Sequence, residues 1–263
     1  MKRKLQALFV ILVLGVLKLP VEESATRYLR EVRLLSPPLD MSVRDSIGQM
    51  GVAASLGGLR SLVASIIYLQ AYTAWSNVDW PKVDSLFQLA TSLQPRYENY
   101  WDEAAWQMAY NAASNYRNNQ QINPALREKL YQDHVERGVE ILKQALKVLP
   151  DSARLWNTLA EVYGRRLEEP EKAAECYLEV FRLIKDARFE RFAAYQYAQT
   201  QKRELWQKAY DMLRTSYDAK QRPPTLINTM KQLENQLNIP EAKRIPEVAT
   251  TTEPQHGKAE AKP

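Results

Sequence analysis

Three side chains in this sequence could act as an acid, a base or a nucleophile near neutral pH: His134, His256 and Cys176. Histidine titrates in this range, and a cysteine thiolate is a strong nucleophile. His134 follows Asp133 in LYQDHVERG, a charged helical pattern, and the sequence holds no matching ligand cluster, so we expect a solvated side chain. His256 lies in a polar tail, and Cys176 is interpreted as a small apolar residue inside a helix. The sequence therefore predicts no catalytic residue.

Motifs that bind cofactors are also missing from the sequence. It contains neither a GxxxxGK phosphate loop nor a GxSxG elbow, and SLGGLR at 55–60 lacks the lysine that a phosphate cradle needs. The single cysteine excludes an intrachain disulfide and a thiolate metal cluster. The net charge of +5 is spread along the chain, whereas nucleic-acid binders concentrate it. We expect a non-enzymatic protein with no cofactor, no metal and no nucleic-acid partner.

The N-terminus predicts the compartment. The basic residues of MKRK precede the apolar run LQALFVILVLGVL, which is how a secretory signal or a signal-anchor begins. The run is short of the ~20 residues that a full crossing takes, yet KLPVEES offers no small-residue cleavage site. We therefore favour an uncleaved transmembrane signal-anchor at residues 1–21 over a removed signal. The positive-inside bias then predicts a single-pass inner-membrane protein with its domain on the periplasmic side.

Two segments separate this anchor from the helical domain. Residues 22–46 indicate a stalk with a proline hinge at SPPLD, where consecutive prolines cannot continue a helix. Residues 47–75 are apolar and could form a second membrane segment, but Arg60 would cost about 2.5–3.5 kcal/mol at a membrane centre. We prefer a helix that is buried by the repeats behind it and could lie at the membrane surface. At the other end, residues 240–263 have almost nothing to bury, which predicts a disordered tail.

The segment between residues 47 and 239 is helical in its periodicity, with no alternating strand pattern, so we expect an all-α domain. Pro95 precedes Trp101 by six residues, and Pro150 precedes Trp156 by the same interval. Each tryptophan opens one apolar helix face at spacing i, i+3, i+4, i+7, comprising Trp101, Ala104, Ala105 and Met108 in one run and Trp156, Leu159, Ala160 and Tyr163 in the other. This recurrence indicates a repeat of helix pairs.

These positions resemble the tetratricopeptide repeat (TPR) superfamily, whose unit of about 34 residues is a helix hairpin. The resemblance implies an α-solenoid with repeats at about 60–97, 98–152, 153–187 and 188–222 and a capping helix at 223–238. The second repeat carries an insertion around 115–134, since Pro95 and Pro150 are 55 residues apart. The resemblance assigns repeat packing to Trp101, Ala105, Trp156, Leu159, Ala160, Tyr163, Ala173 and Tyr177.

In such an array the first helix of each repeat lines a concave groove. The resemblance implies a partner-binding groove formed by Asn99, Asp102, Glu103, Trp106, Tyr110, Arg154, Asn157, Thr158, Glu161 and Arg165. Trp106 and Tyr110 lie off the packing stripe and could supply contact area, while amide and guanidinium groups clamp a peptide. An ordinary solvated face is the alternative interpretation of the same residues.

A membrane-anchored version of this fold resembles inner-membrane TPR proteins of Gram-negative bacteria that act as scaffolds or assembly factors in the cell envelope. The resemblance implies a protein or peptide partner and contact with the membrane through the N-terminal helix. Two alternatives stay open: an accessory subunit of an envelope enzyme, and a cleaved, soluble periplasmic binder of a chaperone-like kind.

Overall fold

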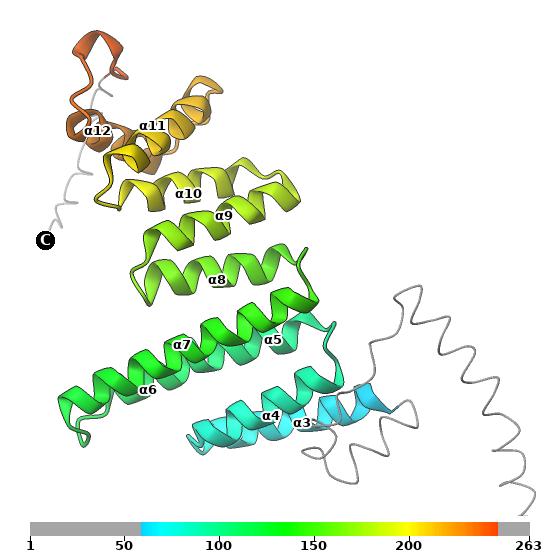
Figure 1. Cartoon of the computed structure of the whole chain (residues 1–263). Helices are drawn as coiled ribbons and strands as arrows, with labels where there is room; N and C mark the ends of the chain where they lie inside the picture. The colour runs from blue at the N-terminus through cyan, green and yellow to red at the C-terminus, as the bar shows by residue number, and fades with distance from the viewer. Residues whose placement is uncertain (1–58, 247–263) are drawn as a thin grey trace, which may run out of the picture.

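The computed structural model describes residues 59–246, which form a succession of helices without a β-strand in that range (Figure 1). The elements are α3 (Arg60–Ser76), α4 (Trp80–Leu93), α5 (Glu98–Trp106), η1 (Gln107–Ala112), α6 (Ala113–Asn118), α7 (Pro124–Val148), α8 (Ala153–Arg165), α9 (Pro170–Ile184), α10 (Ala187–Ala198), α11 (Arg203–Asp218), α12 (Pro224–Gln236) and η2 (Glu241–Lys243). The predicted all-α class is confirmed for these residues. The anchor, the stalk and residues 47–58 lie outside the described range. Within that range, no helix combines the length and the apolar character that a membrane crossing requires.

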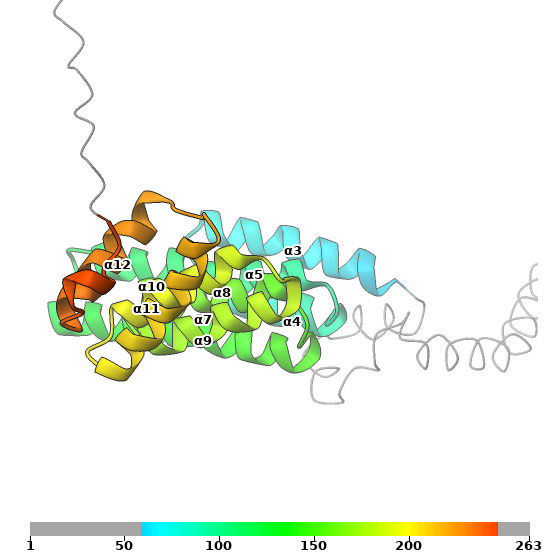
Figure 2. The same cartoon turned by 90° about the horizontal axis from the view of Figure 1, so that it is seen from above.

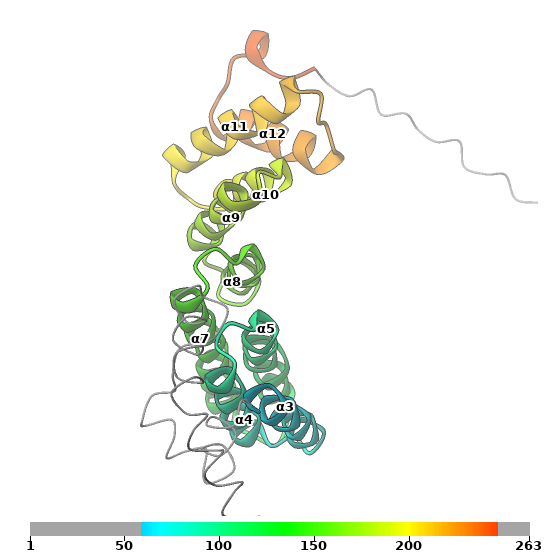
Figure 3. The ribbon, with the colours of Figure 1, turned by 90° about the vertical axis from the view of Figure 1, so that its right-hand side faces the viewer.

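Consecutive helices pack side by side in two layers. Seen from the side, α5, α8 and α10 form one layer, while α4, α7 and α9 form the other (Figure 3). The view from above shows the same two layers, with α3 continuing the first of them (Figure 2). At the far end, α12 packs against α10 and α11. This stacking of hairpins is an α-solenoid, in which each pair buries its apolar faces against its neighbours.

Side-chain caps fix where the helices begin. The side chain of Asp79 accepts a hydrogen bond from the Lys82 amide at the start of α4, and that of Asn123 accepts one from the Ala125 amide at the start of α7. Each cap satisfies an amide that has no partner inside its own helix. Both helices also carry proline in the first turn, where the missing N–H does no harm.

A side-chain hydrogen bond explains the six-residue interval between proline and tryptophan. The indole Nε1 donates to the carbonyl oxygen six residues earlier in three places: Trp101 to Pro95 at 2.9 Å, Trp156 to Pro150 at 2.9 Å, and Trp206 to Thr200 at 2.6 Å. The third case has no proline, and it opens α11, the second helix of its pair. The interval therefore marks a way of entering a helix and does not depend on proline.

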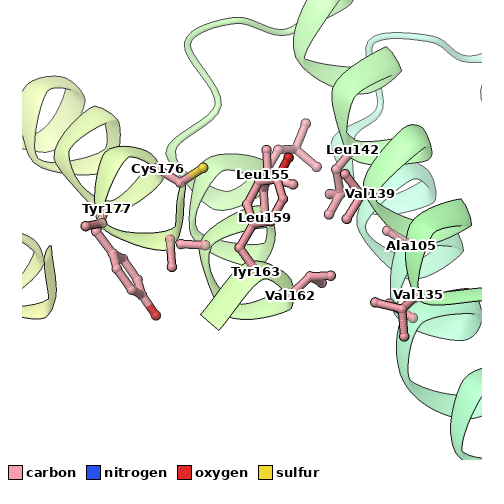
Figure 4. Packing of buried hydrophobic residues seen from close by; sticks show 14 of the residues in the cluster. Ala105, Val135, Val139, Leu142, Leu155, Leu159, Val162, Tyr163, Cys176 and Tyr177 are labelled. Carbon is pink, nitrogen blue, oxygen red and sulfur yellow. The ribbon is translucent and has the colours of Figure 1, made fainter. Parts of the chain in front are cut away.

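The core runs without interruption through the repeats. Six of the residues assigned to repeat packing are buried: Ala105, Leu159, Ala160, Tyr163, Ala173 and Tyr177. Trp101 and Trp156 are partly buried and pack against the same core. Between the second and third pairs, Val139 and Leu142 of α7 meet Leu155 of α8 (Figure 4). Such interfaces between neighbouring pairs stabilise a stacked array.

The second helix pair is longer than the others because the extra residues extend its helices. The chain is helical from Glu98 to Asn118, with a π-helical turn at Gln107–Ala112, and helical again from Pro124 to Val148. The connection between α6 and α7 spans only 119–123, so most of the predicted insertion at 115–134 is helical. The insertion therefore lengthens the wall of the groove.

The C-terminal boundary also differs from the prediction of a disordered tail from residue 240. Ile245 is buried, its amide donates to Glu234 Oε1 at 2.6 Å, and its carbonyl accepts from Lys231 Nζ at 2.5 Å. The Glu234 carboxylate also accepts from the Tyr210 hydroxyl at 3.2 Å. One apolar side chain and a buried acceptor thus hold residues 240–245 against α12, a long-range pairing that composition does not reveal.

Candidate partner-binding cleft

Four of the predicted groove residues bond to each other across two repeats. Arg154 Nε donates to Asp102 Oδ2 at 2.7 Å, and the same guanidinium donates to Asn99 Oδ1. Thr158 Oγ1 donates to Asp102 Oδ1 at 2.6 Å. Because both carboxylate oxygens of Asp102 accept from α8, these side chains set the spacing of α5 and α8. Their main contribution is to the shape of the groove.

Glu103 belongs to a second polar network, which joins α3 to α5. Its Oε1 accepts from the Tyr72 hydroxyl at 3.2 Å and from Gln107 Nε2 at 2.9 Å. Gln107 in turn accepts from Asn111 Nδ2 at 2.8 Å. This chain of bonds crosses the π-helical turn and fixes the first helix pair against the second.

The remaining polar residues of the predicted groove lie on α8. Asn157 Nδ2 is 3.4 Å from Glu161 Oε1, one turn away, and Arg165 is exposed at the end of the helix. Burial raises the pKa of Tyr110, and the Glu161 carboxylate raises it further, while Arg166 and Arg165 act in the opposite direction. The structure therefore brings Glu161 and Arg165 into the electrostatic surroundings of Tyr110.

Trp106 and Tyr110 form the aromatic part of the site. Their rings stack with centroids 4.1 Å apart and planes 14° from parallel. The Arg166 guanidinium carbon lies 4.2 Å from the Tyr110 centroid, a cation–π distance. Arg166 is held in place by Ser114, whose hydroxyl accepts from the guanidinium at 3.1 Å. Trp106 is 44% exposed, so this stack presents an open indole to its surroundings.

That indole lines a cleft of about 890 Å³ between the first helix pair and the extended second pair. We call it the Trp75–Trp106 cleft, and its walls are formed by Trp75, Ser76, Val78, Trp80, Trp106, Tyr110, Asn111, Ser114, Asn115, Asn118, Asn119 and Arg166. Trp80 Nε1 donates to Asn115 Oδ1 at 3.0 Å, so the amide nitrogen of Asn115 points away from Trp80. The cleft thus combines three indoles, one phenol, four carboxamides and one guanidinium.

Of the ten predicted groove residues, the cleft includes two, Trp106 and Tyr110. Sequence reasoning missed Trp75, in the last turn of α3, and Val78, just after this helix, because they join the α6 residues of the cleft only in the folded chain. It also missed Asn111, Asn115 and Asn118, although their spacing of four and three residues continues the helix face begun by Trp106. That spacing was the available signal.

The backbone at the rim of the cleft is strained. Val78 has a φ of 59°, a left-handed conformation in which a β-branched side chain is a rare outlier. Other described residues with positive φ also lie where a helix ends, but they are Glu168, Lys185, Lys220 and Asn238, none of them β-branched. Strain at a site edge is an observation that points to function.

Replacing Val78 by glycine is expected to stabilise the fold by about 1 kcal/mol, because glycine adopts the left-handed conformation without a steric cost. Urea unfolding of Val78→Gly and the wild-type chain measures the difference. If Val78 contributes contact area in the cleft, the same variant binds its partner less tightly. A destabilised Val78→Gly chain would show that the valine side chain is retained for packing, not for binding.

Of the three side chains that the sequence offers for chemistry, His256 lies outside the described residues, and His134 and Cys176 lie away from the cleft. His134 is partly buried, contrary to the expectation of a solvated side chain, with Nδ1 2.7 Å from the Leu130 carbonyl oxygen and its ring 4.7 Å from that of Tyr116. Residues 59–246 contain no group of three His, Cys, Asp or Glu side chains placed to hold a metal ion. Cys176 is buried as a core residue.

Burial raises the pKa of the Cys176 thiol to about 12, so the thiol is neutral at pH 8. Because the thiolate is the reactive form, we expect iodoacetamide to leave Cys176 unmodified in the folded protein at pH 8. Denaturation in guanidinium should expose it to rapid alkylation. Mass spectrometry of the two samples checks this, and modification of the native chain at the rate of a free thiol would contradict the burial.

The stacked helix pairs and the core that joins them decide the fold. Residues 59–246 form an α-solenoid of stacked helix hairpins. Comparison with solved structures finds a thermophilic TPR protein of Thermus thermophilus, with 18% sequence identity and a TM-score of 0.36, covering 75% of this chain and 100% of that one. No protein-family model matches this chain, and no curated protein sequence matches it.

Proposed function

We propose that this chain is a membrane-anchored interaction scaffold, acting as an assembly factor of a bacterial cell-envelope complex, and that it docks a protein partner in the Trp75–Trp106 cleft. The observation that carries the proposal is the exposure of two indoles that line one cleft, 41% for Trp75 and 44% for Trp106. Tryptophan is among the residues that most often dominate binding energy at protein interfaces.

The chemistry of the cleft favours an extended peptide segment as the docked element. Indole faces offer a large apolar area with little side-chain entropy to lose on binding. The carboxamides of Asn115 and Asn118 can donate to and accept from a peptide backbone, while Arg166 offers a cation to a carboxylate. Because the polar networks through Asp102 and Glu103 hold the walls in place, the site is largely formed before binding, which reduces the cost of association.

Membrane anchoring is the second part of the proposal, and it rests on residues 1–21. We expect the full-length chain to stay in the membrane fraction after carbonate washing, with its N-terminus at or near Met1. Recovery of a soluble chain that begins beyond Val21 would replace the anchor by a cleaved signal. The cleft would then belong to a soluble periplasmic binder.

A blocking variant tests the docking site. Asn118 is exposed and lines the cleft, so Asn118→Arg should fill the cleft with a bulky cation without disturbing the core. The matched control is Gln132→Arg, at an exposed position of α7 that does not line the cleft. Tagged full-length chains are captured from gently solubilised membranes, and bound proteins are quantified by mass spectrometry. The proposal requires a partner that is retained by the wild type and by Gln132→Arg and lost with Asn118→Arg; equal retention by all three would refute it.

A further inference from the structure

Helix α3 carries apolar side chains on two opposite sides. Its inner side is buried against the solenoid by Val63, Ala64, Ile67, Ala71 and Ala74. A second row, at spacings of three and four residues, is exposed: Leu59 by 54%, Leu62 by 56%, Ile66 by 39% and Leu69 by 65%. We call these four residues the outer α3 row. Side chains at this spacing share one face of a helix, so the row forms a continuous aliphatic strip.

The two ends of the solenoid differ in whether they expose apolar side chains. Helices α3 and α12 lie at opposite ends of the array (Figures 1 and 3). The exposed residues of α12 include Thr225, Asn228, Gln232 and Asn235, all of them polar. Stacked arrays need a polar outer face on each terminal unit to stay soluble. The α12 end meets that requirement and the α3 end does not, so the outer α3 row is expected to be covered in the working protein.

The charge of α3 points to the kind of surface that covers it. Over its 17 residues, RSLVASIIYLQAYTAWS, the helix holds one charged residue, Arg60, and no acidic residue. A lipid surface accepts such a helix, because the aliphatic row can enter the acyl boundary. An acidic residue on this face would have opposed that contact by repulsion.

The position of α3 in the chain also favours contact with a lipid surface. It is the first described helix, and it follows the membrane anchor proposed for residues 1–21 by 38 residues, from 21 to 59. A chain of that length reaches at most roughly 130 Å when fully extended, at about 3.3–3.6 Å per residue. The anchor therefore confines the α3 end of the solenoid to within that distance of the bilayer, which raises the local concentration of lipid surface.

We infer that the outer α3 row lies in the interfacial region of the lipid bilayer, so that the solenoid rests on the membrane by its first helix. The inference rests on the proposed membrane anchoring and goes beyond it by orienting the domain. With α3 against the lipid, the α12 end points away from the bilayer, and the Trp75–Trp106 cleft, which begins where α3 ends, opens near the membrane surface.

Site-directed fluorescence quenching tests this orientation in the full-length protein. Single cysteines at Leu62→Cys and Leu69→Cys are labelled with bimane, and the chain is reconstituted into vesicles of phosphatidylethanolamine and phosphatidylglycerol that contain a doxyl-labelled lipid. Native Cys176 is buried and does not compete for the label. The control positions are Leu126→Cys on α7, where the native side chain is 47% exposed, and Gln232→Cys on α12. Circular dichroism checks that each labelled chain is folded.

The inference predicts at least twofold stronger doxyl quenching at positions 62 and 69 than at 126 and 232, together with protection from aqueous iodide at 62 and 69. Equal quenching at the four positions would overturn it. Protection from iodide without doxyl quenching would also overturn it, because protein would then cover the outer α3 row. Energy transfer between labels on mixed copies would identify a second copy as the cover. Its absence would identify a segment of the same chain.

A separate measurement distinguishes failure of the proposed anchor from failure of lipid contact by α3. If carbonate washing releases the chain, the anchoring proposal fails, and the labelled soluble chain is then added to the same vesicles. Doxyl quenching at 62 and 69 would still support lipid contact by α3 in that case, whereas its absence would remove both claims.

Discussion

A Gly138→Ala variant is expected to lose about 1–3 kcal/mol of unfolding free energy, the range for overpacking a close-packed core. A Cβ at this position of α7 would lie 2.6 Å from Ala109 Cβ and 3.0 Å from the backbone oxygen of Ala105. Neither atom is the end of a flexible side chain, so one of the two helices must shift. Glycine to alanine inside a free helix would instead gain about 1 kcal/mol. The predicted sign is therefore opposite to helix propensity.

Thermal and urea unfolding measure this effect, and a loss of about 1–3 kcal/mol corresponds to a melting temperature lower by about 2–4 °C for each kcal/mol. Gly164→Ala is the matched control, because an added Cβ on α8 would meet only the side chain of Gln196, at 3.1–3.3 Å. A flexible amide can move by a few tenths of an ångström, so this variant should be near neutral. If Gly138→Ala is as stable as Gly164→Ala, then α7 does not approach the π-helical turn as closely as described above.

The second large effect concerns binding. Trp106→Ala is expected to weaken partner binding by about 30-fold to 1,000-fold, equivalent to about 2–4 kcal/mol, as for the truncation of an aromatic anchor. The change removes one of the two exposed indoles and also the ring stacked on Tyr110. Because Trp106 is 44% exposed, its loss should cost far less stability than the loss of a fully buried tryptophan.

Titration of the purified chain with the partner identified by capture gives the dissociation constants. Phe192→Ala serves as the control, since Phe192 is an aromatic residue of similar exposure, 41%, on α10 and outside the cleft. Its binding should stay within a factor of about three of the wild type. Loss of affinity in both variants would indicate a general loss of structure, and retained affinity in Trp106→Ala would remove this residue from the interface.

Much of the fold could be predicted from local sequence patterns. The interval from Pro150 to Trp156 and the small residues that follow depend on contacts within one helix and its entry turn, so they are visible in the chain. The π-helical turn at Gln107–Ala112 was not visible, because no residue type specifies it. It arises where α5 packs against α7 around Gly138, which is a long-range contact.

The candidate site was predicted only in part, for a related reason. Helical spacing correctly separated Trp106 from the packing stripe of Trp101, but it could not show that Arg154 would bond to Asp102 of the preceding repeat. Exposed polar residues look alike in a sequence whether they bind a partner or each other. Trp75 of α3 lines the same cleft as Asn115 and Asn118 of α6, and only the folded chain shows that.

Site-specific photo-crosslinking tests the central claim, that the Trp75–Trp106 cleft docks a protein partner, most directly. Benzoylphenylalanine is placed in the full-length chain at Val78 and at Asn118, which both line the cleft, and at Gln132 on α7, which lies outside it. The account predicts that irradiation links one and the same protein to positions 78 and 118 and leaves position 132 without that adduct. Adducts that form at 132 and at neither cleft position would contradict it.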